Sequence, residues 1–476
     1  MYGLSSRVGS GLQSAPPPDC LQVGSRKREE MKIELNADFA AWIDRESENL
    51  AGQVRDITHE FPRSTGALHP DHPVTKFGRE DIIGEISVSI TEPTGRLSAQ
   101  FFPHQGRQLG LSGASMNEAE RTVERIWSRK EFVNILSRDT VRELLLSFVG
   151  AKARELQTPS LSDRLLQIVD ERVQSLSVWI PIEEVFVDGE FKFATATLSP
   201  VSKAELDAIV QDGCTGAPAD GLMKLREKLH AKWAGRTIMR LNLTAEPARA
   251  RELALEQAAD YMTLLQIYTS AAMVLSLSSH VAPKGARPYR TDECIVFAPK
   301  FFEQKKSIAE ATHQLVIDAQ HCAFMNQMGL SILSKLACGP TCDYEERLLS
   351  SLLVYGRACY QLDPNDKLLQ VMTAVEMFAL RSDNEPIQAA LADRLAFALS
   401  DDPNSRQQIA QNLRDAYAAR SGRTHHGRSI SDTEVVEQFL SNAWGFFLAA
   451  LQGVGQFRMR LEFLDQIDGK KYGHGG

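Results

Sequence analysis

Helix-starting signals most constrain the fold of the C-terminal part of the chain, residues 336–476. Asp363-Pro-Asn-Asp366 and Asp402-Pro403 each place a capping carboxylate directly before a proline at the first helical position. Ser431-Asp-Thr-Glu434 has the spacing of a capping box. The loops between these helices are short, which predicts antiparallel neighbours and therefore an all-α helical bundle.

A further helix is predicted to open at Asp343 and Glu346, which resemble a capping pair. Its apolar residues recur at helical spacing, and Gly356 lies on the same side, which we expect to be buried. These apolar residues are Leu348, Leu349, Leu352 and Leu353.

The run from Asn404 to about Arg420 has apolar residues at the spacing of an amphipathic helix. Gly422 follows the last of them, and a glycine there can adopt the left-handed conformation that ends a helix. We therefore expect the helix to stop at Gly422. Arg420 would lie on its last turn, and His425 and His426 would lie in a segment that folds back beside it.

An arginine and a histidine in this arrangement suit RNA chemistry. A guanidinium is permanently charged and binds phosphate oxygens through two N–H groups, while a histidine can accept or donate a proton near neutral pH. Attack of a ribose 2′-hydroxyl on the neighbouring phosphate needs both functions and no metal ion. The residues therefore favour a metal-independent cleavage of RNA.

The surrounding residues strengthen this interpretation. Arg420-Ser421-Gly422 and His425-His426-Gly427 resemble the R-x4-6-H signature of HEPN ribonuclease domains, specifically the Apea-like HEPN group. Residues 391–396 and 409–417 resemble the last helices before that motif, and the resemblance covers about the final quarter of the chain. It implies a HEPN-like bundle that acts as an endoribonuclease without a metal or cofactor.

The resemblance also implies the roles of individual residues. Arg420 and His425 match the x4 spacing and are the expected catalytic pair, while His426 takes the role of His425 if the spacing is x5. HEPN ribonucleases form dimers whose motifs face each other, so a homodimer or higher homo-oligomer would supply two proton carriers. The family often has an acidic residue that supports the motif arginine, and Glu376 is the candidate here.

Glu376 is flanked by Val375, Met377 and Phe378. An ionised carboxylate among apolar groups is costly unless it is paired, so Arg420 or a motif histidine is the expected partner. The alternatives are a structural ion pair with another arginine, or a position at the edge of the bundle.

The net charge of the chain is −8, so any RNA contact must be local. Arg414, Arg423 and Arg428 form a basic cluster with Arg420, and together with Tyr417 they are the predicted substrate-binding residues. The alternative is a solvated helix end with ordinary surface arginines.

Residues 31–335 have an α+β pattern and no recognisable catalytic spacing, so by elimination we predict a recognition or regulatory region. The alternatives for its organisation are a single region or two subdomains divided near residue 176. Residues 1–30 have the composition of a disordered tail, and Met31 is a candidate start. The clearest β signal is a predicted hairpin of residues 177–187 and 190–198 joined by Asp188-Gly189.

Seven scattered cysteines show no disulfide framework, which favours reduced thiols and a cytoplasmic location. The close pair Cys338 and Cys342 reads as part of a linker and not as a metal half-site, because no second pair matches it. We predict no signal peptide and no membrane span.

The leading hypothesis is an anti-phage endoribonuclease that is restrained or triggered by its N-terminal region, with a phage-derived or regulatory protein as the trigger. The competing hypotheses are an inactive HEPN module that binds RNA or a partner protein, and a dimerisation domain.

Overall fold

The computed structural model describes residues 33–57, 88–91, 97–104, 107–214, 218–286, 291–298, 301–308, 312–382, 384–426 and 432–471. They form two compact units. The first comprises the described residues up to Glu131 together with Asp139–Glu171, and the second comprises Phe132–Arg138 and the chain from Arg172 on. The predicted tail, 1–30, and Met31 lie outside the described residues.

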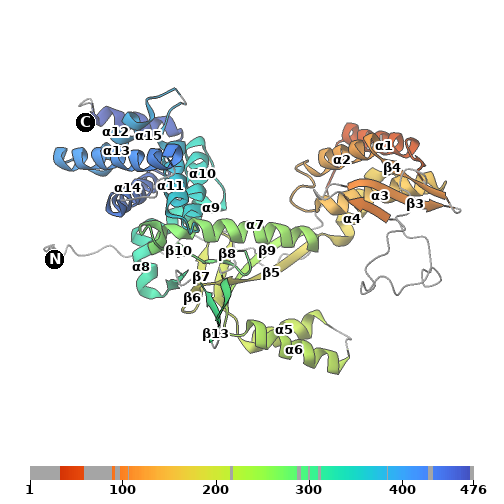
Figure 1. Ribbon diagram of the computed structural model, residues 1–476. Coiled ribbons are helices and arrows are strands. Elements are labelled where there is room, and N and C mark those ends of the chain that lie inside the picture. The colour runs from red at the N-terminus through yellow and green to blue at the C-terminus, as the bar shows by residue number, and fades with distance from the viewer. Residues whose placement is uncertain are drawn as a thin grey trace, which may run out of the picture. The chain divides into compact units, whose positions relative to one another are not determined.

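The first unit combines an antiparallel sheet of strand order β1-β4-β3-β2 with helices α1 to α4 (Figure 1). Helix α3 packs closely on this sheet, because a β-carbon at Gly150 would lie 2.5 Å from the Phe102 ring. The bounds are α1 Ala37–Gly52, β1 Arg55–Asp56, β2 Val88–Thr91, β3 Leu97–His104, β4 Arg107–Ser112, α2 Ala114–Trp127, α3 Arg138–Ala153 and α4 Leu161–Arg172.

The second unit is built on a five-stranded antiparallel sheet of order β11-β5-β9-β8-β7. Its strands are β5 Gln174–Glu183, β7 Phe191–Phe193, β8 Ala196–Pro200, β9 Thr237–Ala245 and β11 Ala282–Pro283. The remaining elements before the C-terminal helices are β6 Val185–Val187, α5 Lys203–Gly213, α6 Ala219–Trp233, α7 Pro247–Leu265, η3 Gln266–Tyr268, η4 Ser270–Ala272, β10 Ser278–Ser279, β12 Thr291–Ala298, β13 Phe301–Ile308, β14 Thr312–His313 and β15 Leu315–Ile317.

The predicted hairpin around Asp188-Gly189 is wrong in its pairing. The first run of the prediction is interrupted at Glu184, which has a φ of 58°, and splits into β5 and β6. Strand β5 pairs with β9, and β6 pairs in parallel with β15. The turn at Asp188-Gly189 exists, but it leads from β6 into β7, which pairs with β8.

Helix α7 contacts both the sheet and the C-terminal helices (Figure 1). Its Ala254, Ala258 and Met262 are fully buried. At Gly356 of α10 (Asp343–Ala358), a β-carbon would lie only 2.1 Å from the carbonyl oxygen of Thr263 in α7. The sheet, α7 and the C-terminal helices therefore share one continuous hydrophobic core, and the predicted domain boundary at 335/336 falls inside this unit.

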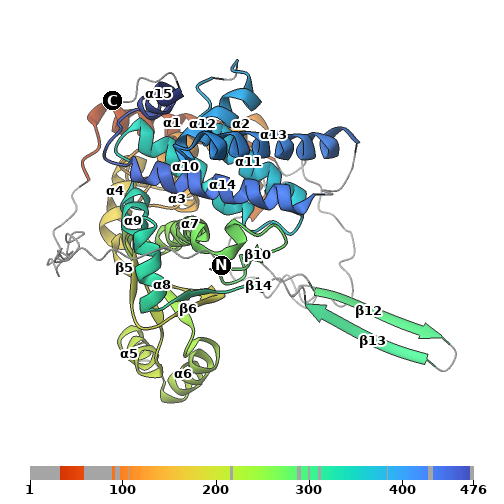
Figure 2. The same cartoon turned by 90° about the vertical axis from the view of Figure 1, so that its left-hand side faces the viewer.

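From Ala319 to the end of the described residues, the regular elements are helices (Figure 2). The chain is thus α+β in its N-terminal part and helical in its C-terminal part. The helices are α8 Ala319–Gln327, α9 Leu330–Cys338, α10 Asp343–Ala358, α11 Pro364–Ala379, α12 Ile387–Leu399, α13 Pro403–His426, α14 Thr433–Gln452 and α15 Arg460–Lys471.

The predicted helix starts fare differently. Asp363 caps α11 by accepting a hydrogen bond from Asn365 N at 2.8 Å, as predicted. Asp432 caps α14 by accepting from Val435 N at 3.1 Å. The predicted cap at Asp343 is wrong, because Cys342 precedes the helix and the Asp343 carboxylate accepts from Arg460 N at 3.0 Å.

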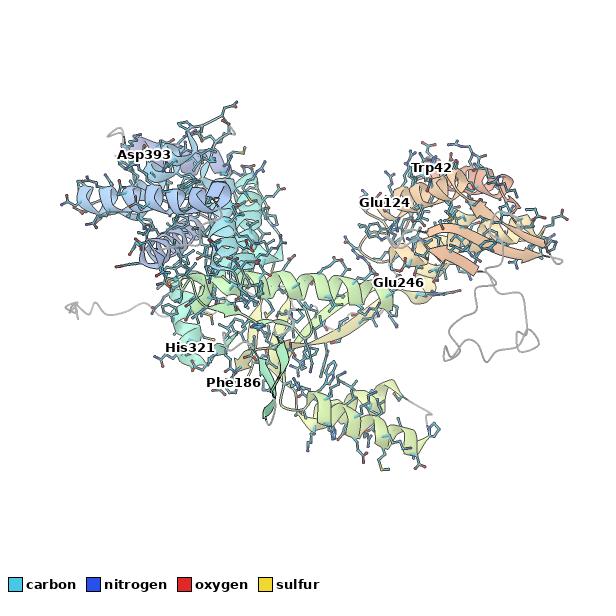
Figure 3. All side chains as sticks on the ribbon, viewed as in Figure 1. Trp42, Glu124, Phe186, Glu246, His321 and Asp393 are labelled. Atoms are coloured by element: carbon cyan, nitrogen blue, oxygen red, sulfur yellow. The ribbon has the colours of Figure 1, made fainter. Side chains whose placement is uncertain are left out.

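The short segment Phe132–Arg138 is held by the start of α7, where Figure 3 labels Glu246. The Glu246 carboxylate accepts from Ser137 N at 2.6 Å, and Glu246 N donates to Ile135 O at 2.9 Å. Arg249 Nε donates to Val133 O at 2.8 Å. The second unit therefore includes a piece of chain that lies within the sequence of the first.

Lys367 is fully buried at the start of α11. Its Nζ donates to Val274 O and Leu277 O, each at 2.7 Å, which ties α11 to the segment after η4. Burial lowers the pKa of Lys367 to about 8, opposed by the charges of Cys359 and Glu437.

Among the described helices, none has the length and apolar content needed to cross a lipid bilayer.

The first prediction concerns the contact between α7 and α10. Gly356→Ala should lower the free energy of unfolding of the second unit by about 1–3 kcal/mol, because the new methyl group overpacks against the Thr263 backbone. Denaturant unfolding followed by circular dichroism measures this. Gly221→Ala is the matched control, since a β-carbon there meets nothing within 4 Å, and it should be neutral or stabilising by up to about 1 kcal/mol. Equal stability of both variants would contradict the close contact.

The second prediction concerns Lys367. A pKa lowered on folding means that the unfolded chain binds more protons between pH about 8 and the ordinary value of 10.5, so stability should rise with pH in that window. Lys367→Met removes this contribution. The difference in unfolding free energy, wild type minus Lys367→Met, should increase from pH 8 to 10.5 by at most about 1.4 kcal/mol per pH unit. A flat difference in urea titrations across this range would contradict it.

Candidate functional site

Helix α13 does not end at Gly422. It runs from Pro403 to His426 and includes both histidines, so the predicted stop and the predicted fold-back are wrong. A glycine inside a helix costs only about 1 kcal/mol relative to alanine. The neighbouring alanines and arginines are good helix formers, and they outweigh that cost.

The continuous helix separates the motif positions. At about 100° per residue, position 425 lies about 140° around the helix axis from Arg420, and position 426 lies about 120° in the opposite direction. The structure describes the backbone, but not the side chains, of Arg423, His425 and His426. Arg428 lies outside the described residues. Within one chain, the backbone therefore does not bring the two histidine positions to the side of Arg420.

Glu376 joins α11 to α13. Arg420 Nη1 donates to Glu376 Oε1 at 2.9 Å, and the Tyr417 hydroxyl donates to the same oxygen. The predicted partnership of Glu376 with Arg420 is confirmed. Tyr417 and Arg420 can share this carboxylate because residues three apart lie on one side of a helix.

The cluster is half-buried. The side chain of Glu376 is 21% exposed and that of Arg420 is 31% exposed, so the guanidinium is partly accessible to solvent. Burial, and then the hydrogen bond to Glu376, raise the pKa of Tyr417 well above its ordinary value. Tyr417 is therefore a neutral hydrogen-bond donor at physiological pH, and Glu376 accepts from one neutral and one charged group.

Polar contacts with the neighbouring helices hold α13 in place. Asn412 Nδ2 donates to Val435 O at 2.8 Å, and Asn442 Nδ2 donates to Asn412 Oδ1 at 2.9 Å, which joins α13 to α14. Gln388 of α12 donates to Arg414 O at 3.4 Å. The Arg414 side chain is exposed, and the Tyr417 hydroxyl is bound to Glu376.

The bond from Tyr417 to Glu376 was not predicted, although a signal for it exists. Tyr417 lies three residues before Arg420, and the predicted ion pair already placed Glu376 beside that side of the helix. The geometry makes Tyr417 a residue that orients Glu376, and through it Arg420.

The cysteine pair follows the linker prediction. Cys338 ends α9, and Cys342 directly precedes α10. In the part of the chain that the structure describes, no three His, Cys, Asp or Glu side chains gather closely enough to hold a metal ion.

No protein-family model, no curated protein sequence and no solved structure matches this chain.

The third prediction tests the shared carboxylate. Glu376→Ala should lower the free energy of unfolding by about 1–3 kcal/mol, because the Tyr417 hydroxyl loses its acceptor in a half-buried position. Adding Tyr417→Phe to that variant should recover part of the loss, because the unsatisfied hydroxyl is then gone. Chemical denaturation of the single and double variants measures this, with the exposed Glu346→Ala on α10 as control. Strictly additive losses would show that the two side chains are not coupled.

Proposed function

We propose that this chain is a metal-independent endoribonuclease of the HEPN type, with Arg420 as its phosphate-binding and charge-stabilising residue. The observation that carries the proposal is the cluster of Glu376, Tyr417 and Arg420. It holds a partly exposed guanidinium in a fixed place on α13, one to two turns before the two histidines.

The proposed reaction is an internal transesterification. A base removes the proton of the ribose 2′-hydroxyl, the 2′-oxygen attacks the adjacent phosphorus, and the bond from phosphorus to the 5′-oxygen breaks. An acid then protonates the leaving 5′-oxygen, so the products are a 2′,3′-cyclic phosphate and a 5′-hydroxyl. Arg420 stabilises the charge that develops on the phosphate oxygens, and Glu376 keeps its guanidinium oriented.

The histidines supply the proton transfers. His425 is the proposed base or acid, and His426 is its alternative. Because their helix positions lie away from that of Arg420, the site requires the histidine of a second copy of the chain, as expected for a homodimer with facing motifs. Arg414, Arg423 and Arg428 would bind flanking phosphates in this arrangement.

The same helix geometry favours a second candidate function. A continuous α13 that keeps Arg420 and the histidine positions on different sides is also what an inactive HEPN module would show. Such a module would bind RNA or a partner protein, or hold two chains together, without cleavage.

The biological role is part of the proposal and rests on the resemblance alone. Ribonucleases of this kind commonly act in bacterial defence against phage, by cutting RNA once an invader is sensed. The α+β region would then restrain the nuclease or respond to a phage-derived trigger.

The fourth prediction tests catalysis. Purified protein should cleave RNA in the presence of EDTA, and Arg420→Ala or His425→Ala should reduce the rate by about 10²–10⁴-fold, because each removes a transition-state contact or a proton carrier. Gel analysis of labelled RNA measures this. Arg347→Ala and His321→Ala are matched controls, since both side chains are exposed on other helices of the same unit.

Full activity in both Arg420→Ala and His425→Ala would refute the assignment. RNA binding that the His425→Ala change leaves intact, with no cleavage by either protein, would favour the inactive module.

A further inference from the structure

Two helices, α5 and α6, are inserted between neighbouring strands of the second unit. Strands β8 and β9 pair antiparallel, with Pro200 opposite Thr237, so a tight turn would be enough to join them. The connection instead runs from Val201 to Arg236 and contains both helices (Figure 1). An excursion of this kind on a rigid sheet is a common place for a binding function.

One side of α6 holds the helix pair in place. Leu229 and Trp233 pack against a small apolar cluster that includes Val201, Leu206 and Ile238. Among the charged residues of α6, Arg226 and His230 face α5: His230 Nε2 lies 2.9 Å and Arg226 Nε 3.7 Å from Asp207 Oδ1. Leu229, Trp233 and two of the basic side chains are therefore used to hold the helix pair in place.

The opposite side of α6 carries a row of three exposed lysines, Lys224, Lys228 and Lys232, which we call the lysine row. They follow one another at i, i+4 and i+8, so they lie within an arc of about 80° and span about 12 Å along the helix. No ion pair with a described carboxylate is found for any of them at 4 Å or less. Two exposed carboxylates border the row, Asp220 on the first turn of α6 and Glu227, so three lysines against two carboxylates leave this side with a net charge of +1, in a chain whose net charge is −8.

The pattern fits a polyanion better than a lipid surface. A helix that lies on a membrane combines basic residues with an apolar face that inserts between the lipids. In α6, Leu229 and Trp233 pack against the apolar cluster, and the other leucines are partly buried. The exposed large apolar residues in the described part of the pair are Met223 of α6 and Ile209 of α5, which is too few for a membrane-inserting face. Flexible, strongly hydrated ammonium groups suit contact with successive phosphates.

We propose that the lysine row binds the phosphate backbone of RNA, without reading its sequence, and so holds long substrates on the second unit. The proposal deepens the proposed function and rests on it for the identity of the polyanion as RNA. In both views, α6 and α13 lie on opposite sides of α7 (Figures 1 and 2). The row therefore serves RNA that is long enough to reach both helices, and not short oligonucleotides.

The test compares charge-reversed variants by fluorescence anisotropy with a long, unstructured, labelled RNA over a range of salt concentrations. All proteins carry Arg420→Ala, so that the RNA is not consumed. Lys224→Glu, Lys228→Glu and Lys232→Glu together should weaken binding about tenfold or more, and should reduce the slope of log K against log salt by about 2, as expected for three lost phosphate contacts. Glu227→Lys should change affinity in the opposite direction.

The matched control reverses three exposed lysines elsewhere in the second unit, Lys192, Lys284 and Lys335. It makes the same change in net charge and should keep the salt slope of the parent protein. Equal losses in both triple variants, or no loss in the lysine-row variant, would overturn the proposal. So would a lysine-row variant that loses binding to anionic lipid vesicles but keeps binding to RNA.

A cleavage assay distinguishes failure of the proposed nuclease function from failure of the lysine-row proposal. With Arg420 restored, the lysine-row variant should cleave a short oligonucleotide at the parent rate and a long RNA more slowly at subsaturating concentration. If the parent protein cleaves neither RNA, the nuclease assignment fails, while the anisotropy experiment still decides whether the row binds RNA.

Discussion

The burial of α7 on two sides is the constraint on which the second unit depends. One side of this helix covers the five-stranded sheet, and the other meets α10 so closely that the backbone of Thr263 occupies the place of a side chain at Gly356. Apolar residues from the sheet to the last helix thus form one core. The C-terminal helices that carry the candidate site therefore share their hydrophobic core with strands that come much earlier in the sequence.

Within that framework, the candidate site is organised by a single carboxylate oxygen. Glu376 Oε1 accepts hydrogen bonds from Arg420 and from Tyr417, and so links α11 to α13, the helix that carries the motif. A half-buried carboxylate needs such partners to offset the loss of water. The same contact that satisfies Glu376 also fixes the direction of the guanidinium, so packing and the proposed catalytic geometry have one physical origin.

The sequence predicts those features that depend on local rules. The cap at Asp363 follows from the residue and the proline after it, and the pairing of Glu376 with a cation follows from the cost of burying a charge. The features that it mispredicts depend on competition. Gly422 is compatible with a helix end, but the small free-energy cost of a glycine inside a helix is outweighed by the helix propensity of its neighbours. Strand β5 pairs with the distant strand β9 instead of forming a local hairpin.

The segment Phe132–Arg138 has a consequence for how the protein is made and cut. During synthesis this segment leaves the ribosome long before Glu246 and Arg249, which bind its backbone. It can therefore form its native hydrogen bonds only after those residues have been synthesised. The N-terminal unit must therefore accommodate an unfinished insertion while it folds. For the same reason, a shortened protein that starts at Arg172 would lack an integral part of the remaining unit, and any loss of activity in such a truncation would report on missing structure as much as on missing regulation.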